Sequence, residues 1–400
     1  MKLVIVGASL AGLRAAEAAR KADPDVEITL IGAEPHLPYD RPPLSKAYLN
    51  PADDVDGVPD PNHFRDEAFF AGAAIELRLG KPATDLTSSQ VILGGDTVDY
   101  DRLIVATGCT PRTLPGAEDL AGVHTLRTLD DAIAIRAALD AGKRTVVIGA
   151  GFIGSEIAAG AHQRGVPVTV LEALPVPLVR SVGEATGRAA TALHAKHGLD
   201  LRCGVVLDGL VSGGGRVTGV RLADGEVLPA ELVVVGIGVR PATEWLASTG
   251  IALYDDGSIV CDGTLATSLP NVWAAGDVAR FPNALFDDAL MRLEHWTNAA
   301  EQGQLAARNA LNPAEAKVSQ AVPYFWSDWY GSRIQFVGIP AAEEILVVAE
   351  EPFLALYRRG DRITGALTID RPSEIMKYRR QIGNRGSWAD ALTFAGVAAD

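Results

Sequence analysis

Residues 145–172 read TVVIGAGFIGSEIAAGAHQRGVPVTVLE. The branched apolar run at 145–148 predicts a buried strand, and the glycine-rich GAGFIG at 149–154 predicts a tight turn. A helical pattern follows at 155–165, and the run at 166–172 predicts a second strand. Two parallel strands need a crossover helix between them, so this stretch predicts a phosphate-binding βαβ unit of an α/β fold.

The same plan opens the chain, with KLVIV at 2–6, GASLAG at 7–12, a helical pattern and the strand VEITLIG. The repetition continues further along, because DTVDYDRLIVATG at 96–108 resembles GEVLPAELVVVGIG at 225–238. In both segments a hairpin leads into a branched apolar strand that ends at glycine. The repeated element is therefore expected to be a whole nucleotide-binding domain.

The second glycine turn matches the dinucleotide-binding pattern at Gly149, Gly151 and Gly154. Glycines at these positions let the backbone approach a pyrophosphate, and the helix N-terminus supplies free N–H groups. Glu172 closes the next strand, where a carboxylate accepts hydrogen bonds from a free ribose diol and repels a 2′-phosphate. The pattern favours NADH, although the neighbouring Arg180 leaves NADPH open.

The first glycine turn departs from this pattern, because Ser9 stands between Gly7 and Gly12 where a middle glycine is usual. A small side chain there is tolerable, but it leaves less room for a pyrophosphate. The acid is displaced as well, since Ala33 directly follows the strand and Glu34 comes next. Either Glu34 reaches the ribose from a shifted loop, or the diol has a different partner.

Two dinucleotide sites in one chain suggest two different cofactors. Nicotinamide carries hydride, and flavin is the group that accepts it, so the second dinucleotide is expected to be FAD. The late stretch LATSLPNVWAAGDVAR predicts a strand that ends at Gly276 and Asp277. A carboxylate there suits the ribityl chain of FAD held by the first domain, which would then be split by the inserted NAD domain.

From Val322 the sequence changes to aromatic and β-branched strands, with one helix near 373–382, and this predicts a smaller α+β domain. Another helix is expected over 296–311. The predicted domains are an FAD-binding domain in two parts (1–111 and 245–321), an NAD-binding domain (112–244) and a C-terminal interface domain (322–400).

The composition excludes several classes of protein. A net charge of −14 argues against nucleic-acid binding, which needs a basic face. The chain has three cysteines, Cys109, Cys203 and Cys261, whose spacing predicts neither a disulfide framework nor a metal site. Since no run approaches the roughly 20 apolar residues that span a bilayer, a reduced cytoplasmic location without a membrane anchor is expected.

The segment PYDRPPLSK (38–46) is unusual because two adjacent prolines disfavour both a helix and a central strand. Arg41 and Lys46 are therefore expected on a stiff loop. Arg41 is expected to anchor this loop, and Lys46 to face the chemistry.

At this point the motifs carry a resemblance. GASLAG, PYDRPPLSK, LIVATG, TLRTLDDA, GAGFIGSE, VGIGVRP, AAGDVA, EHWTNAAEQG and PYFWSD occur in this order across nearly the whole chain. Together they resemble the bacterial FAD-dependent ferredoxin reductases of the putidaredoxin reductase and biphenyl dioxygenase reductase type, within the glutathione reductase structural superfamily. The resemblance implies an NADH:ferredoxin oxidoreductase. Such an enzyme passes single electrons to an iron–sulfur ferredoxin that serves a monooxygenase or dioxygenase.

The resemblance also implies individual roles. Lys46 matches a lysine beside the flavin ring, Arg127 and Asp277 match FAD contacts, Trp296 matches a residue near the pyrimidine end, and Ala83 matches an adenine contact. The other candidate cofactor-binding residues lie in the same motifs: Leu10, Ala11, Thr107, Gly108, Phe152, Ile153, Gly236, Gly238 and Glu294.

For the chemistry, we expect Lys46 to stabilise negative charge that develops on the flavin. Glu156, in the first turn of the second crossover helix, is expected to pair with Lys46. Trp326 is a candidate for packing over the flavin edge and relaying electrons, with a core tryptophan as the alternative. Trp329 stands where the family often has glutamine, and His295 is expected to be structural rather than a proton shuttle.

The partner is expected to be an acidic ferredoxin, for which an acidic reductase needs a local basic patch. The candidate cations are Lys377, Arg379, Arg380 and Arg385, with Arg333 and Arg65 as additions.

Other activities of the superfamily stay open in part. No cysteine lies between residues 12 and 60, so the thiol chemistry of disulfide reductases and NADH peroxidases is nearly excluded. Rubredoxin reductase or monodehydroascorbate reductase activity needs no such cysteine. A flavoprotein similar to apoptosis-inducing factor, acting through partners, is the remaining alternative.

Overall fold

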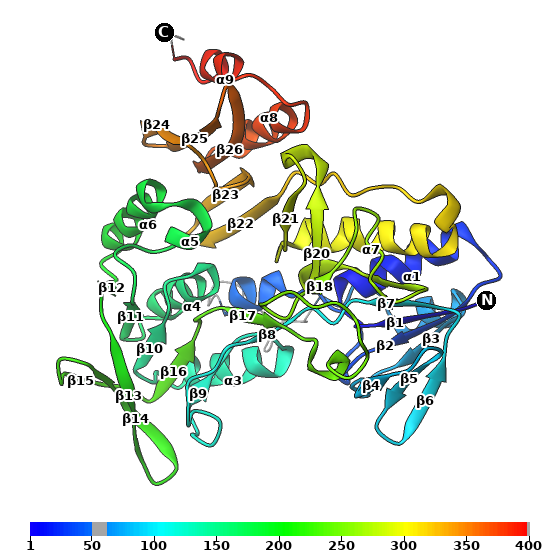
Figure 1. Cartoon of the computed structure of the whole chain (residues 1–400). Helices are drawn as coiled ribbons and strands as arrows, with labels where there is room; N and C mark the ends of the chain where they lie inside the picture. Colours follow the sequence, from blue (N-terminus) through cyan, green and yellow to red (C-terminus); the bar gives the residue numbers. More distant parts are fainter. Residues whose placement is uncertain (50–61, 398–400) are drawn as a thin grey trace. The chain divides into compact units, whose positions relative to one another are not determined.

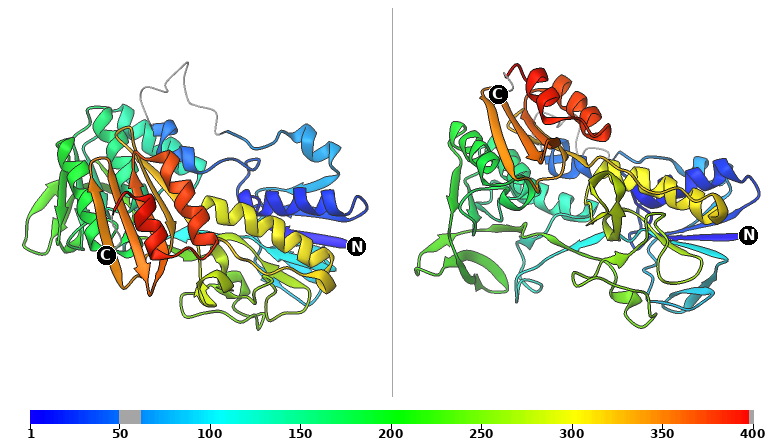
Figure 2. Two further views of the ribbon diagram at one scale, coloured as in Figure 1. Left: turned by 90° about the horizontal axis from the view of Figure 1, so that it is seen from above. Right: turned by 45° about the horizontal axis from the view of Figure 1, so that its top comes forward.

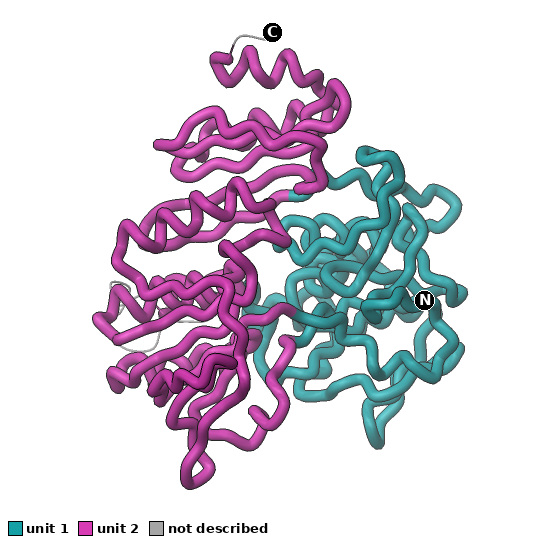
Figure 3. Tube along the Cα trace, turned by 60° about the vertical axis from the view of Figure 1, so that its left-hand side comes forward, with its two compact units in different colours: residues 1–40, 62–110, 239–323 teal, residues 41–61, 111–238, 324–400 magenta. Residues whose placement is uncertain are grey.

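The computed structural model describes residues 1–49 and 62–397. The chain forms two compact units, each assembled from segments that are distant in the sequence (Figure 3). Unit 1 contains residues 1–40, 62–110 and 239–323. Unit 2 contains residues 111–238 together with the described parts of 41–61 and 324–400. The domain boundaries expected after 111, 244 and 321 lie near unit boundaries, and the division into three functional domains stays a prediction.

Unit 1 is built on a five-stranded parallel sheet in the order β19-β7-β1-β2-β3 (Figure 1). Its central strand, β1, has four consecutive buried residues because a parallel sheet is covered on both faces. The helix α1 is the crossover between β1 and β2, as the glycine turn predicted. The strands of the sheet are β1 (Lys2–Val6), β2 (Glu27–Ile31), β3 (Ile75–Arg78), β7 (Arg102–Val105) and β19 (Val272–Ala274).

Two long helices of unit 1 lie side by side, as Figure 2 shows for α1 (Leu10–Ala22) and α7 (Trp296–Leu311). They approach so closely that a Cβ atom on Gly303 would lie 2.1 Å from the carbonyl oxygen of Ala11. The late helix therefore packs directly on the helix that follows the first glycine turn. The bounds of α7 are those that the sequence predicts.

Smaller elements complete unit 1. A three-stranded antiparallel sheet is formed by β4 (Asp85–Leu86), β5 (Gln90–Leu93) and β6 (Asp96–Asp99). The remaining strands are β8 (Cys109–Pro111), β17 (Val239–Pro241), β18 (Ile259–Val260), β20 (Ala279–Asn283) and β21 (Ala289–Met291). The remaining helices are α2 (Glu67–Gly72) and the short 3₁₀ helices η4 (Glu244–Leu246), η5 (Gly276–Val278), η6 (Ala284–Phe286) and η7 (Pro313–Glu315).

Unit 2 repeats the same architecture with a second parallel sheet in the order β12-β11-β10-β16-β9. Strand β10 corresponds to β1, helix α4 to α1, and β16 to β7, so the predicted repeat of a whole domain is present. The strands are β9 (Val123–His124), β10 (Thr145–Ile148), β11 (Val168–Glu172), β12 (Asp200–Cys203) and β16 (Leu232–Val235), and an antiparallel sheet comprises β13 (Leu207–Gly213), β14 (Arg216–Leu222) and β15 (Val227–Pro229). The helices are α3 (Leu129–Asp140), α4 (Phe152–Gln163), α5 (Val179–Val182) and α6 (Glu184–Lys196).

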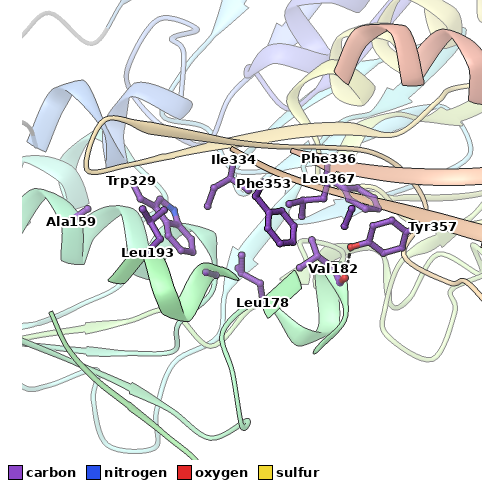
Figure 4. Packing of buried hydrophobic residues seen from close by; sticks show 12 residues of the cluster. Ala159, Leu178, Val182, Leu193, Trp329, Ile334, Phe336, Phe353, Tyr357 and Leu367 are labelled. Carbon is purple, nitrogen blue, oxygen red and sulfur yellow. Dashed lines mark hydrogen bonds between the residues drawn. The ribbon is translucent and has the colours of Figure 1, made fainter. Parts of the chain in front are cut away.

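The C-terminal part of unit 2 is a five-stranded antiparallel sheet, β22-β23-β26-β25-β24, with two helices. The strands are β22 (Tyr324–Trp329), β23 (Ser332–Gly338), β24 (Glu344–Glu350), β25 (Phe353–Arg359) and β26 (Arg362–Ile369), and the helices are α8 (Pro372–Gly383) and α9 (Trp388–Phe394). Figure 4 shows that Trp329, Phe336 and Tyr357 of this sheet pack in one buried cluster with Leu178 and Leu193. The antiparallel sheet and the second nucleotide-binding fold therefore share a core.

The segment around the two prolines forms regular structure after all. Pro42–Ser45 is a short 3₁₀ helix, η1, and Ala47–Leu49 forms another, η2. The expectation that this segment disfavours any helix is wrong at this point, because the prolines occupy the first helical positions. A backbone N–H has no intrahelical partner there, and the fixed φ of proline is helical.

Within the described residues, no helix is long and apolar enough to cross a membrane. The described part of the chain also holds no group of three or more His, Cys, Asp or Glu side chains arranged to bind a metal ion.

Candidate functional site

The second glycine turn has the geometry of a phosphate cradle. Gly149 has φ +102°, and a Cβ atom there would lie 2.4 Å from the oxygen of Gly236. A Cβ atom on Gly154 would lie 2.1 Å from the oxygen of Gly149, so both outer glycines are required by the protein's own packing. At Gly151 the nearest atom to such a Cβ is 4.0 Å away. The middle glycine therefore leaves space beside the N-terminus of α4, which is where a pyrophosphate would approach.

Glu172 lies at the end of β11 and holds the loops around this turn. One carboxylate oxygen accepts the amide hydrogen of Ala150 at 2.8 Å, and the other accepts that of Leu174 at 2.9 Å. The predicted ribose acid therefore also fixes the backbone of the glycine turn. Arg180, the possible partner of a 2′-phosphate, is exposed on the short helix α5.

The first glycine turn has the same construction in unit 1. Gly7 has φ +120°, and a Cβ atom there would lie 2.1 Å from the oxygen of Ala106. A Cβ atom on Gly12 would lie 1.9 Å from the oxygen of Gly7. Ser9 is the N-cap of α1 in an extended conformation, and its side chain makes no capping hydrogen bond. The serine is thus accommodated in the turn without displacing the two essential glycines.

The late Gly276–Asp277 pair lies against this first turn, as the sequence predicts. Gly276 has φ +79°, and a Cβ atom there would be 3.2 Å from that of Ala11. The side chain of Gln302 on α7 accepts the amide hydrogen of Gly276 at 2.8 Å. Asp277 is half-buried in η5. A segment more than 260 residues from the first turn is thereby fixed beside it.

Glu34 has a partner within the protein. Its carboxylate accepts a hydrogen bond from the hydroxyl of Tyr39 at 2.6 Å, and its carbonyl oxygen accepts the amide hydrogen of Gly80 at 2.9 Å. Ala33, at the place of the usual acid, is exposed. The displaced acid is therefore held in a fixed position beside the end of β2.

Lys46 and Glu156 form the predicted ion pair within unit 2. The ammonium nitrogen of Lys46 lies 2.8 Å from Oε1 of Glu156, and the side chains are 18% and 3% exposed. Two hydroxyls complete the environment of this carboxylate, since Ser45 donates to Oε2 and Ser327 donates to Oε1. The short 3₁₀ helix η1, helix α4 and strand β22 all contribute to this buried charged cluster.

The segment that carries Lys46 is hydrogen-bonded to residues within or next to helices α3 and α4. The guanidinium of Arg41 donates to the carbonyl oxygen of Arg127. Arg136 on α3 donates to the carbonyl oxygen of Tyr48 at 2.7 Å, and Arg164 donates to that of Leu49 at 2.8 Å. These bonds hold the backbone on either side of Lys46.

Three predicted residues lie near the start of α7 in unit 1. The indole of Trp296 donates to Asp40 at 2.7 Å, and Glu294 is exposed and pairs with Arg292 at 2.6 Å. Burial lowers the pKa of His295 to about 4, so its imidazole is neutral at ordinary pH. This property fits the structural role predicted for His295.

The other predicted cofactor-binding residues are distributed over both units. Thr107 and Gly108 follow β7, and the hydroxyl of Thr107 donates to the carbonyl oxygen of Ala242. The remaining positions are as follows: in unit 1, Leu10 and Ala11 open α1 and Ala83 lies between β3 and β4; in unit 2, Phe152 and Ile153 open α4, and Gly236 and Gly238 follow β16.

Trp326 lies on β22 and stacks on Tyr324 with ring centroids 5.9 Å apart. It is half-buried, so its environment is not that of a fully enclosed core tryptophan. Trp329, by contrast, has no exposed surface and stacks on His194 at 4.7 Å. Alternate residues of a strand point to opposite faces, and this places Trp326 and Trp329 on different sides of the sheet.

Sequence reasoning did not identify Ser45 and Ser327 as partners of Glu156, nor His194 as a neighbour of Ser155 and Trp329. Ser327 accepts a hydrogen bond from the indole of Trp329 at 2.7 Å, and His194 contacts the hydroxyl of Ser155 at 3.1 Å. The sequence signals available for the two serines were their places in the motifs PYFWSD (Ser327) and PPLSK (Ser45). A single hydroxyl in such motifs does not indicate which acid it binds.

The candidate docking cations have different environments. Arg333 makes two hydrogen bonds to Asp328, and Arg65 in unit 1 pairs with Glu17 at 2.8 Å. On α8, Lys377 and Arg380 are exposed. The remaining two candidates are half-buried Arg379, which lies over the ring of Tyr324, and exposed Arg385 just beyond α8.

The comparisons with known proteins agree with this architecture. The chain matches the family described as pyridine nucleotide-disulphide oxidoreductase over residues 1–303, and the family described as reductase C-terminal over residues 324–395. Rhodocoxin reductase of Rhodococcus erythropolis is 36% identical over 389 residues, which cover 95% of this chain and 89% of that protein. The ferredoxin--NAD(+) reductase component of the biphenyl dioxygenase system of Paraburkholderia xenovorans is 35% identical over 394 residues, 96% of this chain and 94% of that protein.

The fold is also that of a solved relative. In the crystal structure of the covalent putidaredoxin reductase–putidaredoxin complex, the similar chain is 35% identical, and the two superpose with a TM-score of 0.89 over 96% of this chain and 93% of that one. Both glycine turns fit a pyrophosphate, since each combines a tight turn with a free helix N-terminus. The chain therefore belongs to the pyridine nucleotide-disulphide oxidoreductase family, as an enzyme for which FAD and NAD(H) are the implied cofactors.

Proposed function

We propose that this chain is an NADH-dependent ferredoxin reductase that supplies a monooxygenase or dioxygenase through an iron–sulfur ferredoxin. The observation that carries the proposal is the extent of the similarity to reductases of this kind. It covers 89% and 94% of the two relatives described above, and it includes the C-terminal sheet as well as both nucleotide-binding folds.

The two glycine turns divide the cofactors between the units. When bound, NADH supplies a hydride, and FAD accepts it and releases the electrons singly. In unit 1, the backbone of Gly7 to Gly12 would hold the pyrophosphate of FAD, with Asp277 beside it. In unit 2, the turn from Gly149 to Gly154 would hold NADH, with Glu172 facing the ribose. The carboxylate of Glu172 supports a preference for NADH over NADPH.

The Lys46–Glu156 pair would orient the nicotinamide and set the local field. Glu156 lies two residues after Gly154, in the second turn of α4 and not in the first turn as the sequence predicts. A cation held at a buried position stabilises negative charge more strongly than it would in water. Trp326, on the other face of β22, remains the candidate aromatic residue for electron relay.

Thiol chemistry is not part of the proposal. Burial raises the pKa of Cys261 to about 12, and burial together with the charge of Glu172 raises the pKa of Cys203. Both thiols are therefore poorly suited to act as nucleophiles. Cys109 is buried, and none of the three cysteines forms a disulfide. We include a reducing, cytoplasmic location in the proposal, since the three cysteines stay reduced there.

The proposal is tested with the FAD-loaded protein, NADH, and a panel of iron–sulfur ferredoxins, with cytochrome c as the final electron acceptor. We expect NADH-dependent reduction of cytochrome c that requires one of the ferredoxins and is much slower with NADPH. If none of the ferredoxins raises the rate of cytochrome c reduction, the proposal is overturned. Very slow turnover with all acceptors, together with tight NAD(H) binding, would instead favour a flavoprotein that acts through partners.

The surface proposed for ferredoxin docking includes the exposed cations Lys377 and Arg380 on α8. Ferredoxins are generally acidic, and steering by opposite charge raises the rate of association. Arg333 contributes less to this steering, since Asp328 neutralises it through two hydrogen bonds.

A further inference from the structure

One face of β22 lies along the helix that carries the second phosphate cradle. Phe325 packs on Phe152 with ring centroids 4.6 Å apart, Ser327 contacts Glu156, and Trp329 stacks on His194. The spacing of two residues places all three side chains of β22 on the same face of the strand. The C-terminal sheet therefore contacts the start of α4 through Phe325 and Ser327, and it contacts α6 through Trp329.

The direction of the hydrogen bonds at Ser327 follows from chemistry. The indole N–H of Trp329 can only donate, and it lies 2.7 Å from the oxygen of Ser327. The oxygen of Ser327 is therefore an acceptor for Trp329, and its one hydrogen is available for Oε1 of Glu156. Trp329 thus fixes the orientation of a hydroxyl that would otherwise rotate.

Three donors converge on the carboxylate of Glu156. The ammonium of Lys46 and the hydroxyl of Ser327 share Oε1, and the hydroxyl of Ser45 donates to Oε2. Because Ser327 and Trp329 are both fully buried, no solvent competes for these bonds at their positions. A buried network whose members are all satisfied holds its groups in one arrangement.

We propose that Ser327 and Trp329 are positioning residues for the Lys46–Glu156 pair. Ser327 holds the carboxylate in register with the start of α4, and Trp329 aims the Ser327 hydroxyl. This inference rests on the proposed function of the pair in orienting NADH. A charged group that must be placed to within a fraction of an ångström needs such support from its neighbours.

The test compares two variants with a matched control. Ser327→Ala removes the bond to Glu156, and Trp329→Phe keeps a ring against His194 but removes the N–H group. Thr368→Val is the control, because Thr368 is a fully buried residue of the same sheet whose hydroxyl has no hydrogen-bond partner among the described residues. Each FAD-loaded variant is examined for its melting temperature, for its dissociation constant for NAD⁺ by calorimetry, and for the rate constant of flavin reduction by NADH in stopped flow.

We expect Ser327→Ala to lower the rate constant of flavin reduction about tenfold, because it removes a hydrogen bond to a carboxylate. Trp329→Phe should lower it about threefold, because it removes only a neutral hydrogen bond. The dissociation constant for NAD⁺ should change less than twofold, because the glycine turn that holds the pyrophosphate is intact. Thr368→Val should leave all three quantities unchanged. A merely structural role would lower the melting temperature and change binding and rate together, and that outcome would overturn the proposal.

A double-mutant cycle tests whether Ser327 acts through Glu156. In the Glu156→Gln background, Ser327→Ala should have little further effect on the rate constant, whereas independent residues would show additive effects. Additive effects would overturn the proposal. Flavin reduction by NADH requires no ferredoxin, so the two hypotheses fail separately. If the double-mutant cycle shows the expected coupling but no ferredoxin of the panel is reduced, only the proposed partner is overturned.

Discussion

Glu172 accepts the amide hydrogen of Ala150 at 2.8 Å, so the carboxylate at the end of β11 holds the middle of the second glycine turn. Its second oxygen holds the backbone after the strand, at Leu174. The residue expected to distinguish two nucleotides is thus also a support for the loop that binds either one.

The substitution Glu172→Ala tests this double role. We expect the KM for NADH to rise about tenfold, because the turn loses a charged acceptor and the ribose loses a partner. The ratio of activities with NADH and NADPH should fall as well. Steady-state oxidation of both nucleotides with ferricyanide measures these quantities. Glu226→Ala, which removes an exposed carboxylate from Arg202, is the control; an unchanged KM for Glu172→Ala would contradict the prediction.

Gly12 packs against the backbone of its own turn and should be indispensable for the binding of FAD. Gly12→Ala places a methyl group 1.9 Å from the oxygen of Gly7, so the turn cannot keep its shape. We expect the purified variant to lack the absorbance of bound flavin. Gly95→Ala in the hairpin between β5 and β6 meets no atom within 4 Å and should retain FAD. Normal flavin content in the Gly12→Ala variant would show that the first turn does not bind the cofactor.

Lys46 should affect the chemical step more than folding. Lys46→Met keeps much of the apolar stem but leaves Glu156 without its cation, and we expect flavin reduction by NADH to slow by about ten- to a hundredfold. Stopped-flow absorbance gives this rate constant. Lys81→Met, which breaks an exposed pair with Asp96, should react at the normal rate. A normal rate in Lys46→Met would reject the role of Lys46.

Charge reversal on α8 tests the docking surface. We expect the double variant Lys377→Glu/Arg380→Glu to reduce ferredoxin at least tenfold more slowly at low salt, and to lose much of the dependence on ionic strength. Its reduction by NADH should be normal, which separates docking from chemistry. Arg216→Glu, an exposed substitution on β14, is the control. An unchanged dependence on salt in the double variant would place the dock elsewhere.

His194 should make stability depend on pH. Burial lowers the pKa of His194 from 6.5 to about 4, so below pH 6.5 the unfolded chain binds a proton that the folded chain does not. Stability from this residue is therefore complete above pH 6.5 and decreases as the pH falls toward 4, by at most about 3 kcal/mol. Urea unfolding at pH 7.5 and pH 5 measures the change. His194→Gln should show a smaller decrease than the natural chain, and an equal decrease in both would contradict this prediction.

The repeated fold could be predicted because its signals are local and periodic. The strand–glycine–helix pattern occurs twice, and α7 has the predicted bounds because Pro313 follows it closely. The helices α2, α3, α5, α6 and α9 were not predicted, because they are short or weakly patterned. The packing of α6 against the C-terminal sheet in the shared core stabilises a helix that local preference alone would not.

The charged pair could be predicted only through the resemblance, whereas its surroundings could not be predicted at all. The contact between Ser327 and Glu156 joins residues 171 positions apart, and serine occurs in many environments. The hydrogen bonds that Glu172 accepts from its own loop could not be predicted either. They depend on the exact path of the backbone, which a pattern of residue types does not specify.

The short segment 41–49 has a consequence for how such reductases can recombine. It belongs to the same compact unit as α3 and α4. Its carbonyl oxygens accept hydrogen bonds from Arg136 on α3 and from Arg164 just after α4, although residues 62–110 of unit 1 lie between them in the sequence. A chimera that takes only residues 112–244 from a relative would set this chain's own segment 41–49 against the relative's residues at positions 136 and 164. Transfer of the second nucleotide-binding fold with these contacts intact therefore requires that the segment carrying Lys46 be transferred along with it.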